Sequence, residues 1–240
     1  MQSADRNLRP GPIIRSPPAV LATIALLVAI HGGLWLAGET WRIWAIYAFA
    51  FIPARFIHPS FPMIQGSQYW SLVTYALLHA DVLHLLFNCL WLLVFGTVAA
   101  RRLGTLRFLS LMAVAAAAGA LAMLALHWGE AAILIGASGA VSGLLGAAIP
   151  VMFAPGMNFA GSYKAGLGHV RPLTFGQLLG NRGALTMAAV WLVVTLFSGA
   201  TGWTGMSFLD EAWIAWEAHL GGFAAGLAAF YALDRGVMRA

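Results

Sequence analysis

Two polar residues in otherwise apolar sequence are of the types needed for nucleophilic chemistry. Ser138 lies in the segment Gly136-Ala137-Ser138-Gly139, where an apolar helix is expected to begin, and His219 lies near the start of another apolar helix. A serine hydroxyl is a weak nucleophile until a base takes its proton, and histidine is the usual base. The pattern predicts a dyad with Ser138 as nucleophile and His219 as general base.

Attack on a carbonyl also requires donors for the oxyanion that develops. His84 and Asn88 are four residues apart in an apolar segment, so they lie on one face of a helix. Their side chains and the backbone N–H of Ser138 are the candidate donors. Glu217 is two residues before His219 and faces another side of that helix, so we expect a dyad and not a triad.

The composition is that of a membrane protein. The chain is 61% hydrophobic and 9% charged, whereas a soluble domain has about 25% charged residues. Its 13 basic residues are spread between apolar stretches, which fits membrane topology and not a nucleic-acid-binding patch. We therefore predict an all-α membrane protein without a separate soluble domain.

Apolar segments long enough to cross a bilayer recur along the chain, since a spanning helix takes about 20 residues. The six predicted spans run approximately over residues 19–37, 82–100, 106–128, 138–153, 184–200 and 212–233. A cleaved signal peptide is the alternative for the first of them. The residues at its end, 34–37, do not form a small-x-small cleavage site, which favours a retained span.

The segment from Trp41 to Ile57 is apolar enough to suggest a seventh span. With six spans and the N-terminus inside, 11 of the 13 basic residues are cytoplasmic and only Arg42 and Arg55 lie outside. A seventh span leaves 4 inside against 9 outside. The positive-inside rule therefore favours six spans, with residues 41–70 as an extracytoplasmic insertion at the membrane interface. The aromatic residues suited to anchoring it there are Trp41, Trp44, Tyr69 and Trp70.

In this topology the second, fourth and sixth spans run in the same direction. His84, Asn88, Ser138 and His219 then share one layer near the extracytoplasmic side. Glycine stripes give the fourth and sixth helices a means of close approach, because small residues let helix backbones touch in lipid. These glycines are Gly139, Gly143 and Gly146 in the fourth span and Gly222 and Gly226 in the sixth.

Taken together, these motifs resemble those of the rhomboid intramembrane serine proteases. The family's second-helix pattern of two histidines and an asparagine is matched by His79, His84 and Asn88. Its Gly-x-Ser-Gly is matched at residues 136–139, and its Ala-His-x-x-Gly-x-x-x-Gly at residues 218–226. The resemblance covers about residues 19–235. It implies a six-helix bundle that cleaves transmembrane segments of other proteins at or near the membrane surface, without metal or cofactor.

The resemblance assigns Ser138 as nucleophile, His219 as base, and His84 and Asn88 to the oxyanion hole. Gly136, like the glycines above, is expected to serve packing near the site. Two departures stand out. Family members often have a tyrosine four residues after the serine, where this chain has Ser142, and Trp-Arg in the first loop, where this chain has Trp70 followed by Ser71.

The expected organisation is a basic cytoplasmic tail (1–18), a membrane domain (19–235) with a first-loop insertion at about 38–78, and a cytoplasmic C-terminal tail (236–240). The short tails favour a bacterial inner membrane. The loop at 154–183 has no interpretable motif. Two other classes stay open: a non-catalytic rhomboid-like protein that binds or retains client membrane proteins, and a channel or transporter. The apolar inner halves of the spans disfavour the latter.

Overall fold

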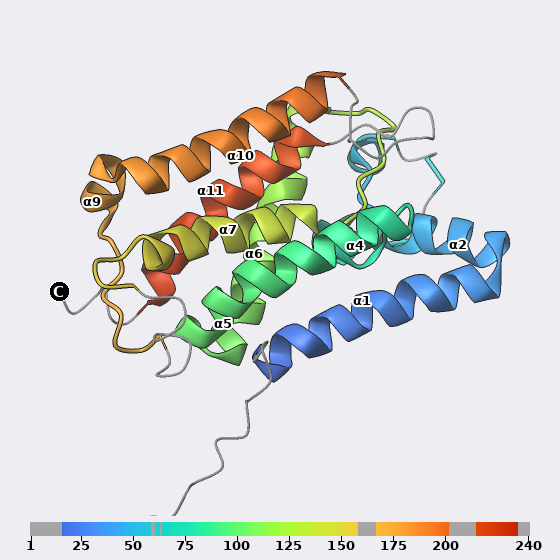
Figure 1. Cartoon of the computed structure of the whole chain (residues 1–240). Coiled ribbons are helices and arrows are strands. Elements are labelled where there is room, and N and C mark those ends of the chain that lie inside the picture. Colours follow the sequence, from blue (N-terminus) through green and yellow to red (C-terminus); the bar gives the residue numbers. More distant parts are fainter. Residues whose placement is uncertain (1–15, 59–60, 63, 158–166, 202–214, 235–240) are drawn as a thin grey trace, which may run out of the picture.

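A computed structural model describes residues 16–58, 61–62, 64–157, 167–201 and 215–234 (Figure 1). All regular elements within these ranges are helical, and the only strand-like pairing described there is an isolated antiparallel bridge between Phe51 and Leu134. Residues 1–15 of the predicted N-terminal tail (1–18), the predicted C-terminal tail (236–240) and the start of the last predicted span, 212–214, lie outside the described residues.

The first half of the chain forms one long helix, a short insertion and a composite helix. These elements are α1 (Pro18–Ala37), α2 (Glu39–Phe49), the 3-10 turn η1 (Pro53–Phe56), α3 (Ser67–Thr74), the 3-10 turn η2 (Tyr75–Leu77), α4 (Val82–Trp91), the π-helical turn η3 (Leu92–Gly96) and α5 (Thr97–Leu103). The second half contains α6 (Thr105–Leu126), α7 (Ser138–Met152), α9 (Phe175–Gly180), α10 (Arg182–Thr201) and α11 (Trp216–Leu233).

Three of the described helices are long and apolar enough to cross a membrane: α1, the continuous run α4-η3-α5, and α6. Helix α7 and the stretch Arg182–Ser198 of α10 are apolar but shorter. The elements follow the predicted spans closely, with small differences at the ends. Helix α6 stops at Leu126 and not at Trp128, because the chain turns there through Gly129, whose φ of +79° is a conformation that glycine adopts readily.

The segment from Trp41 to Ile57, which is apolar enough to suggest a seventh span, folds as two short elements, α2 and η1. Helix α2 has 11 residues, about half the number needed to cross a bilayer. Three side chains donate to carbonyls at its C-terminal end: Arg55 to Ala50 (2.7 Å), Trp70 to the carbonyl of residue 48 (2.6 Å) and Thr74 to that of residue 49 (3.1 Å). These bonds satisfy carbonyls that a helix end leaves without partners, and they tie α2, η1 and α3 together.

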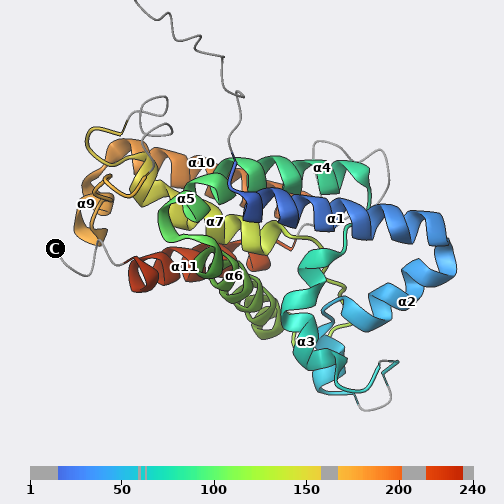
Figure 2. The ribbon, with the colours of Figure 1, turned by 90° about the horizontal axis from the view of Figure 1, so that it is seen from below.

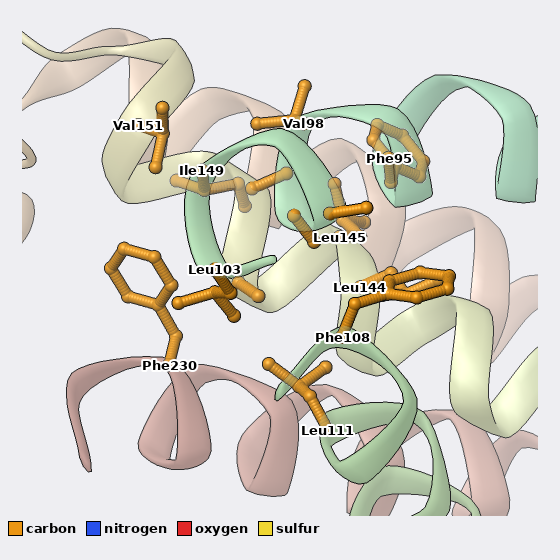
Figure 3. Packing of buried hydrophobic residues seen from close by; sticks show 14 of the residues in the cluster. Phe95, Val98, Leu103, Phe108, Leu111, Leu144, Leu145, Ile149, Val151 and Phe230 are labelled. Atoms are coloured by element: carbon orange, nitrogen blue, oxygen red, sulfur yellow. The ribbon is translucent and has the colours of Figure 1, made fainter. Parts of the chain in front are cut away.

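Helix α7 is the centre of the bundle (Figure 2). Every residue from Gly139 to Val151 is buried. A helix that is apolar all round is buried, either in the core of a protein or in a membrane. Its side chains meet those of α5, α6 and α11: Figure 3 shows Leu144 and Ile149 packed among Leu103, Phe108 and Phe230.

The contact between α7 and α11 is made by backbone. A Cβ placed on Gly222 would overlap the carbonyl of Gly139, and one placed on Gly226 would overlap the backbone of Gly143. A Cβ on Gly146 would lie 2.6 Å from the carbonyl oxygen of Phe223. The glycines of both helices therefore face one another, and any larger residue would push the helices apart.

At the opposite end of α11, a buried arginine organises the loop that follows α7. The Nε atom of Arg102 lies 2.7 Å from a carboxylate oxygen of Asp234, and its Nη1 donates to the carbonyls of Leu167 (2.8 Å) and Val170 (2.6 Å). Tyr231 adds a bond to the carbonyl of Leu173 (2.9 Å). Part of the loop without an interpretable motif is thus held to the ends of α5 and α11.

We expect Gly222→Ala to lower the free energy of unfolding by on the order of 1–3 kcal/mol, because its methyl group would overlap the backbone of Gly139. Gly32→Ala in α1 is the matched control, since a Cβ there meets nothing within 4 Å. That change should be neutral or slightly stabilising. Thermal unfolding of the purified proteins in detergent, followed by circular dichroism, makes the comparison. Equal melting temperatures for the two variants would contradict the close packing of α7 and α11.

Candidate active site

Ser138 is the first residue of α7. The loop before it is held by hydrogen bonds that its own backbone N–H groups donate. The N–H of Gly136 donates to the carbonyl of Tyr75 (3.1 Å), and the N–H of Ala137 donates to Nε2 of His79 (3.4 Å). Burial lowers the pKa of His79 to about 3, so its ring is neutral and offers an acceptor nitrogen. Two groups from the η2–α4 region therefore set the path of the chain into Ser138.

His84 packs directly against this loop. A Cβ on Gly136 would lie 2.6 Å from Nε2 of His84, and the φ of Gly136 is +114°, so a glycine is required on both counts. Asp81 accepts a hydrogen bond from the backbone N–H of His84 (2.8 Å) and so caps α4. The His79 and His84 rings meet edge to face with centroids 5.2 Å apart.

Asn88 lies one turn further along α4 and is buried. Its amide donates one hydrogen bond to the carbonyl of His84 (2.9 Å). A side-chain amide has two donor hydrogens, so this bond occupies only one of them.

The residues next to His219 in α11 contact the residue next to Ser138 in α7. A Cβ on Gly139 would lie 3.3 Å from the carbonyl oxygen of Ala218, and Gly222, one turn after His219, touches Gly139. The rings of His84 and His219 are near enough to interact electrostatically. The four predicted site residues thus gather where the N-terminal ends of α4, α7 and α11 lie, toward the right of Figure 1.

Tyr75, which the sequence analysis did not single out, lies between α6 and the start of α7. Its side chain is fully buried, and its hydroxyl donates to the carbonyl of Ala116 in α6 (3.0 Å). Burial raises the pKa of Tyr75, which keeps the hydroxyl protonated. A Cβ on Gly139 would lie 2.6 Å from the hydroxyl oxygen of Tyr75. Ser142, at the position where relatives often carry a tyrosine, is itself buried.

Glu217 faces away from His219, toward the end of α6. Its carboxylate lies 2.7 Å from Nε2 of His127, whose Nδ1 lies 2.8 Å from the carboxylate of Glu130. The expectation that Glu217 does not orient His219 directly agrees with this geometry. The pairing of Glu217 with His127 could not be predicted from the sequence, because the two residues are 90 positions apart. Among the described residues, no group of three or more His, Cys, Asp or Glu side chains is placed to hold a metal ion.

Comparison with known proteins identifies the family. The Rhomboid domain model matches residues 66–235, well over half of the chain. The chain belongs to the rhomboid family. Its fold is accordingly the all-α membrane bundle of that family, as predicted from the sequence, and the family includes serine proteases.

Three relatives match parts of this rhomboid chain. The rhomboid protease GlpG of Haemophilus influenzae is 38% identical over 53 residues, which are 22% of this chain and 28% of GlpG. YdcA of Bacillus subtilis, a candidate rhomboid protease, is 36% identical over 85 residues, 35% of this chain and 41% of YdcA. The mitochondrial RHOMBOID-like protein 6 of Arabidopsis thaliana is 32% identical over 85 residues, 35% of this chain and 27% of that protein. The chain therefore spans less than half of the length of each of these relatives.

We expect Gly136→Ala to displace His84 and the loop before Ser138, because its methyl group would meet the His84 ring 2.6 Å away. Gly104→Ala separates this contact from backbone strain, since Gly104 also has a positive φ, +82°, but has nothing within 4 Å. Both variants should be destabilised, and only Gly136→Ala should change the environment of His84. Histidine NMR spectra of the two proteins in detergent distinguish them, and an unchanged His84 signal in Gly136→Ala would contradict the contact.

Proposed function

We propose that this protein is an intramembrane serine endopeptidase that cleaves transmembrane segments of other membrane proteins with a Ser138–His219 dyad. The observation that carries the proposal is the backbone contact of Gly139 with Ala218 and Gly222. Gly139 follows Ser138 in the chain and Ala218 precedes His219, so this contact brings together the backbone beside the two dyad residues. Membership of a family that includes serine proteases supports the same conclusion.

In the proposed reaction the Ser138 Oγ attacks the substrate carbonyl carbon while His219 takes the hydroxyl proton. The carbonyl oxygen becomes an oxyanion, the peptide C–N bond then breaks, and His219 gives its proton to the leaving amine. Water then attacks the carbonyl carbon of the resulting ester while His219 takes a proton from the water. The ester C–O bond breaks, and His219 returns the proton to Ser138 Oγ. No other reactant is needed, and both steps pass through a tetrahedral species with one oxyanion.

Three groups are suited to receive that oxyanion. Ser138 begins α7, and the first N–H groups of a helix have no partners within it and carry partial positive charge. The second amide hydrogen of Asn88 and the ring of His84 come from α4. Donors fixed before reaction stabilise developing charge more than mobile water does, because they do not have to reorient.

The proposed substrates reach the site from the bilayer, and the active-site end of the bundle is taken as extracytoplasmic. Both termini are then cytoplasmic in a bacterial inner membrane, as the charge distribution of 11 against 2 basic residues favours. A reporter fused to the C-terminus, active only in the cytoplasm, tests this orientation. Activity of a periplasm-dependent reporter at that position would reverse it.

We expect Ser138→Ala and His219→Ala each to abolish cleavage of a reporter transmembrane substrate in membranes and labelling by a fluorophosphonate probe. Ser142→Ala is the matched control, since it removes a buried serine hydroxyl from the same helix one turn away. It should retain labelling. Cleavage undiminished in Ser138→Ala would overturn the proposal. Absence of both cleavage and labelling in the wild type would favour a rhomboid-like protein that binds client proteins without cutting them.

We expect Asn88→Ala to lower kcat by about 10²- to 10³-fold with little change in KM, as loss of one oxyanion donor commonly does. Cys89→Ala, the adjacent change on α4, should leave kcat within a few fold. Turnover and thermal unfolding are measured on the same preparations. Unchanged turnover with intact folding would make Asn88 a packing residue, whose side chain serves only its bond to the carbonyl of His84.

A further inference from the structure

We infer that His127 is a positioning residue for the dyad: bridged to Glu130 and Glu217, it holds the first turn of α11 and thereby His219. This inference rests on the proposed function. The bridge lies outside the dyad and the oxyanion donors, and it joins the end of α6 to the start of α11.

The bridge has the geometry of two strong hydrogen bonds. Nε2 of His127 lies 2.7 Å from Oε1 of Glu217, and Nδ1 lies 2.8 Å from Oε2 of Glu130. Glu217 is 6% exposed, whereas Glu130 is 59% exposed. A buried carboxylate without a partner is costly, so Glu217 depends on His127 much more than Glu130 does.

The described residues at the start of α11 include no side-chain cap. Ala215 precedes the helix and has no side-chain acceptor to cap it. Glu217 is in the first turn, where a carboxylate also complements the helix dipole. The opposite side of the same turn is fixed through Ala218, whose carbonyl oxygen lies 2.7 Å from the position of a Cβ on Gly119. Among the described residues, His127 therefore supports one side of the turn that leads into His219, opposite the contact of Ala218 with Gly119.

Small displacements of this turn matter for catalysis. Misplacing a catalytic group by about 1 Å costs roughly 10²-fold in rate. The glycine contacts further along, at Gly222 and Gly226, set the distance between α7 and α11, but they lie one and two turns beyond His219. A fixed first turn is what limits tilting of the helix at the level of the dyad.

The bridge also depends on the charge of His127. Only the protonated ring donates from both nitrogens. Hydrogen bonds to Glu217 first, and then to Glu130, raise the pKa of His127 above its ordinary value. The groups facing it are Glu130 from the loop after α6 and Glu217 from α11, with His58 of the first loop beside Gly129. Both hydrogen bonds of the bridge are therefore present below the ordinary histidine pKa. One of them is lost as pH rises through the elevated pKa of the folded protein, because the neutral ring donates from only one nitrogen.

The decisive comparison uses three substitutions in the full chain, assayed in membranes against a reporter transmembrane substrate. Glu217→Leu and His127→Leu should each lower kcat by about tenfold or more with KM changed less than about twofold, since a support for His219 is lost and the binding surface is not. Glu39→Gln is the matched control, because Glu39 is likewise an acid in the first turn of a helix, α2, and takes no part in the bridge. It should leave kcat unchanged.

Rescue by a conservative variant separates positioning from bulk stability. His127→Gln retains a donor for Glu217 but does not titrate, so it should recover part of kcat and remove the fall in activity that the wild type shows on the alkaline side. A wild-type kcat that is flat through that range, or the same alkaline fall in His127→Gln, would contradict the inference.

Amide hydrogen exchange over residues 216–220 gives a readout that needs no turnover. Exchange there should be faster in His127→Leu than in the wild type or in Glu39→Gln. A wild type that neither cleaves nor labels would overturn the proposed function, and exchange would still decide whether the bridge holds α11. Unchanged exchange together with unchanged kcat in His127→Leu would overturn the inference itself.

Discussion

The rest of the structure depends on the direct contact between the backbones of α7 and α11. In a bilayer, apolar side chains gain little by leaving lipid for protein, so helices associate through close packing of small residues. Gly139 meets Gly222, and Gly143 meets Gly226, with no side chain between them. Such an approach brings residues that are 81 positions apart, Ser138 and His219, to the same end of one helix pair. Helix α6 completes the contact, because Gly119 admits the carbonyl of Ala218.

A second constraint acts on the chain before Ser138. The Gly136 to Ala137 segment has no polar side chain, and its backbone N–H groups are held by the carbonyl of Tyr75 and the ring of His79. Those two residues belong to the region between α3 and α4, which the bonds of Arg55, Trp70 and Thr74 to the end of α2 secure in turn. The first-loop insertion is therefore connected to the site through hydrogen bonds, and the position of Ser138 depends on elements far from it in sequence.

Much of the fold could be predicted from hydropathy and charge. The positions of the membrane helices in the described residues were predicted to within a few residues, because apolar length is a local property. Assignment to the rhomboid family rested on short motifs read together, and the family match over residues 66–235 confirms it. The insertion was predicted as a non-spanning segment. The prediction did not include helix α2 or the buried Arg55 that donates a hydrogen bond at its C-terminal end.

The candidate site was predicted less completely. His84, Asn88, Ser138 and His219 could be named because polar residues are rare in apolar helices and therefore conspicuous. Tyr75 and His127 could not, since a tyrosine in a loop and a histidine at a helix end are ordinary in sequence. Their importance comes from what lies opposite: Ala116 and Gly139 for Tyr75, Glu217 for His127.

The sequence by itself therefore determined the membrane class, the helices and the four polar residues that mark the site, because each follows from the properties of a short segment. Only the tertiary structure decided which backbone atoms hold the loop before Ser138 and which carboxylate faces His127. Those choices depend on contacts between segments 58 and 90 residues apart, and no local pattern encodes a distance across the bundle.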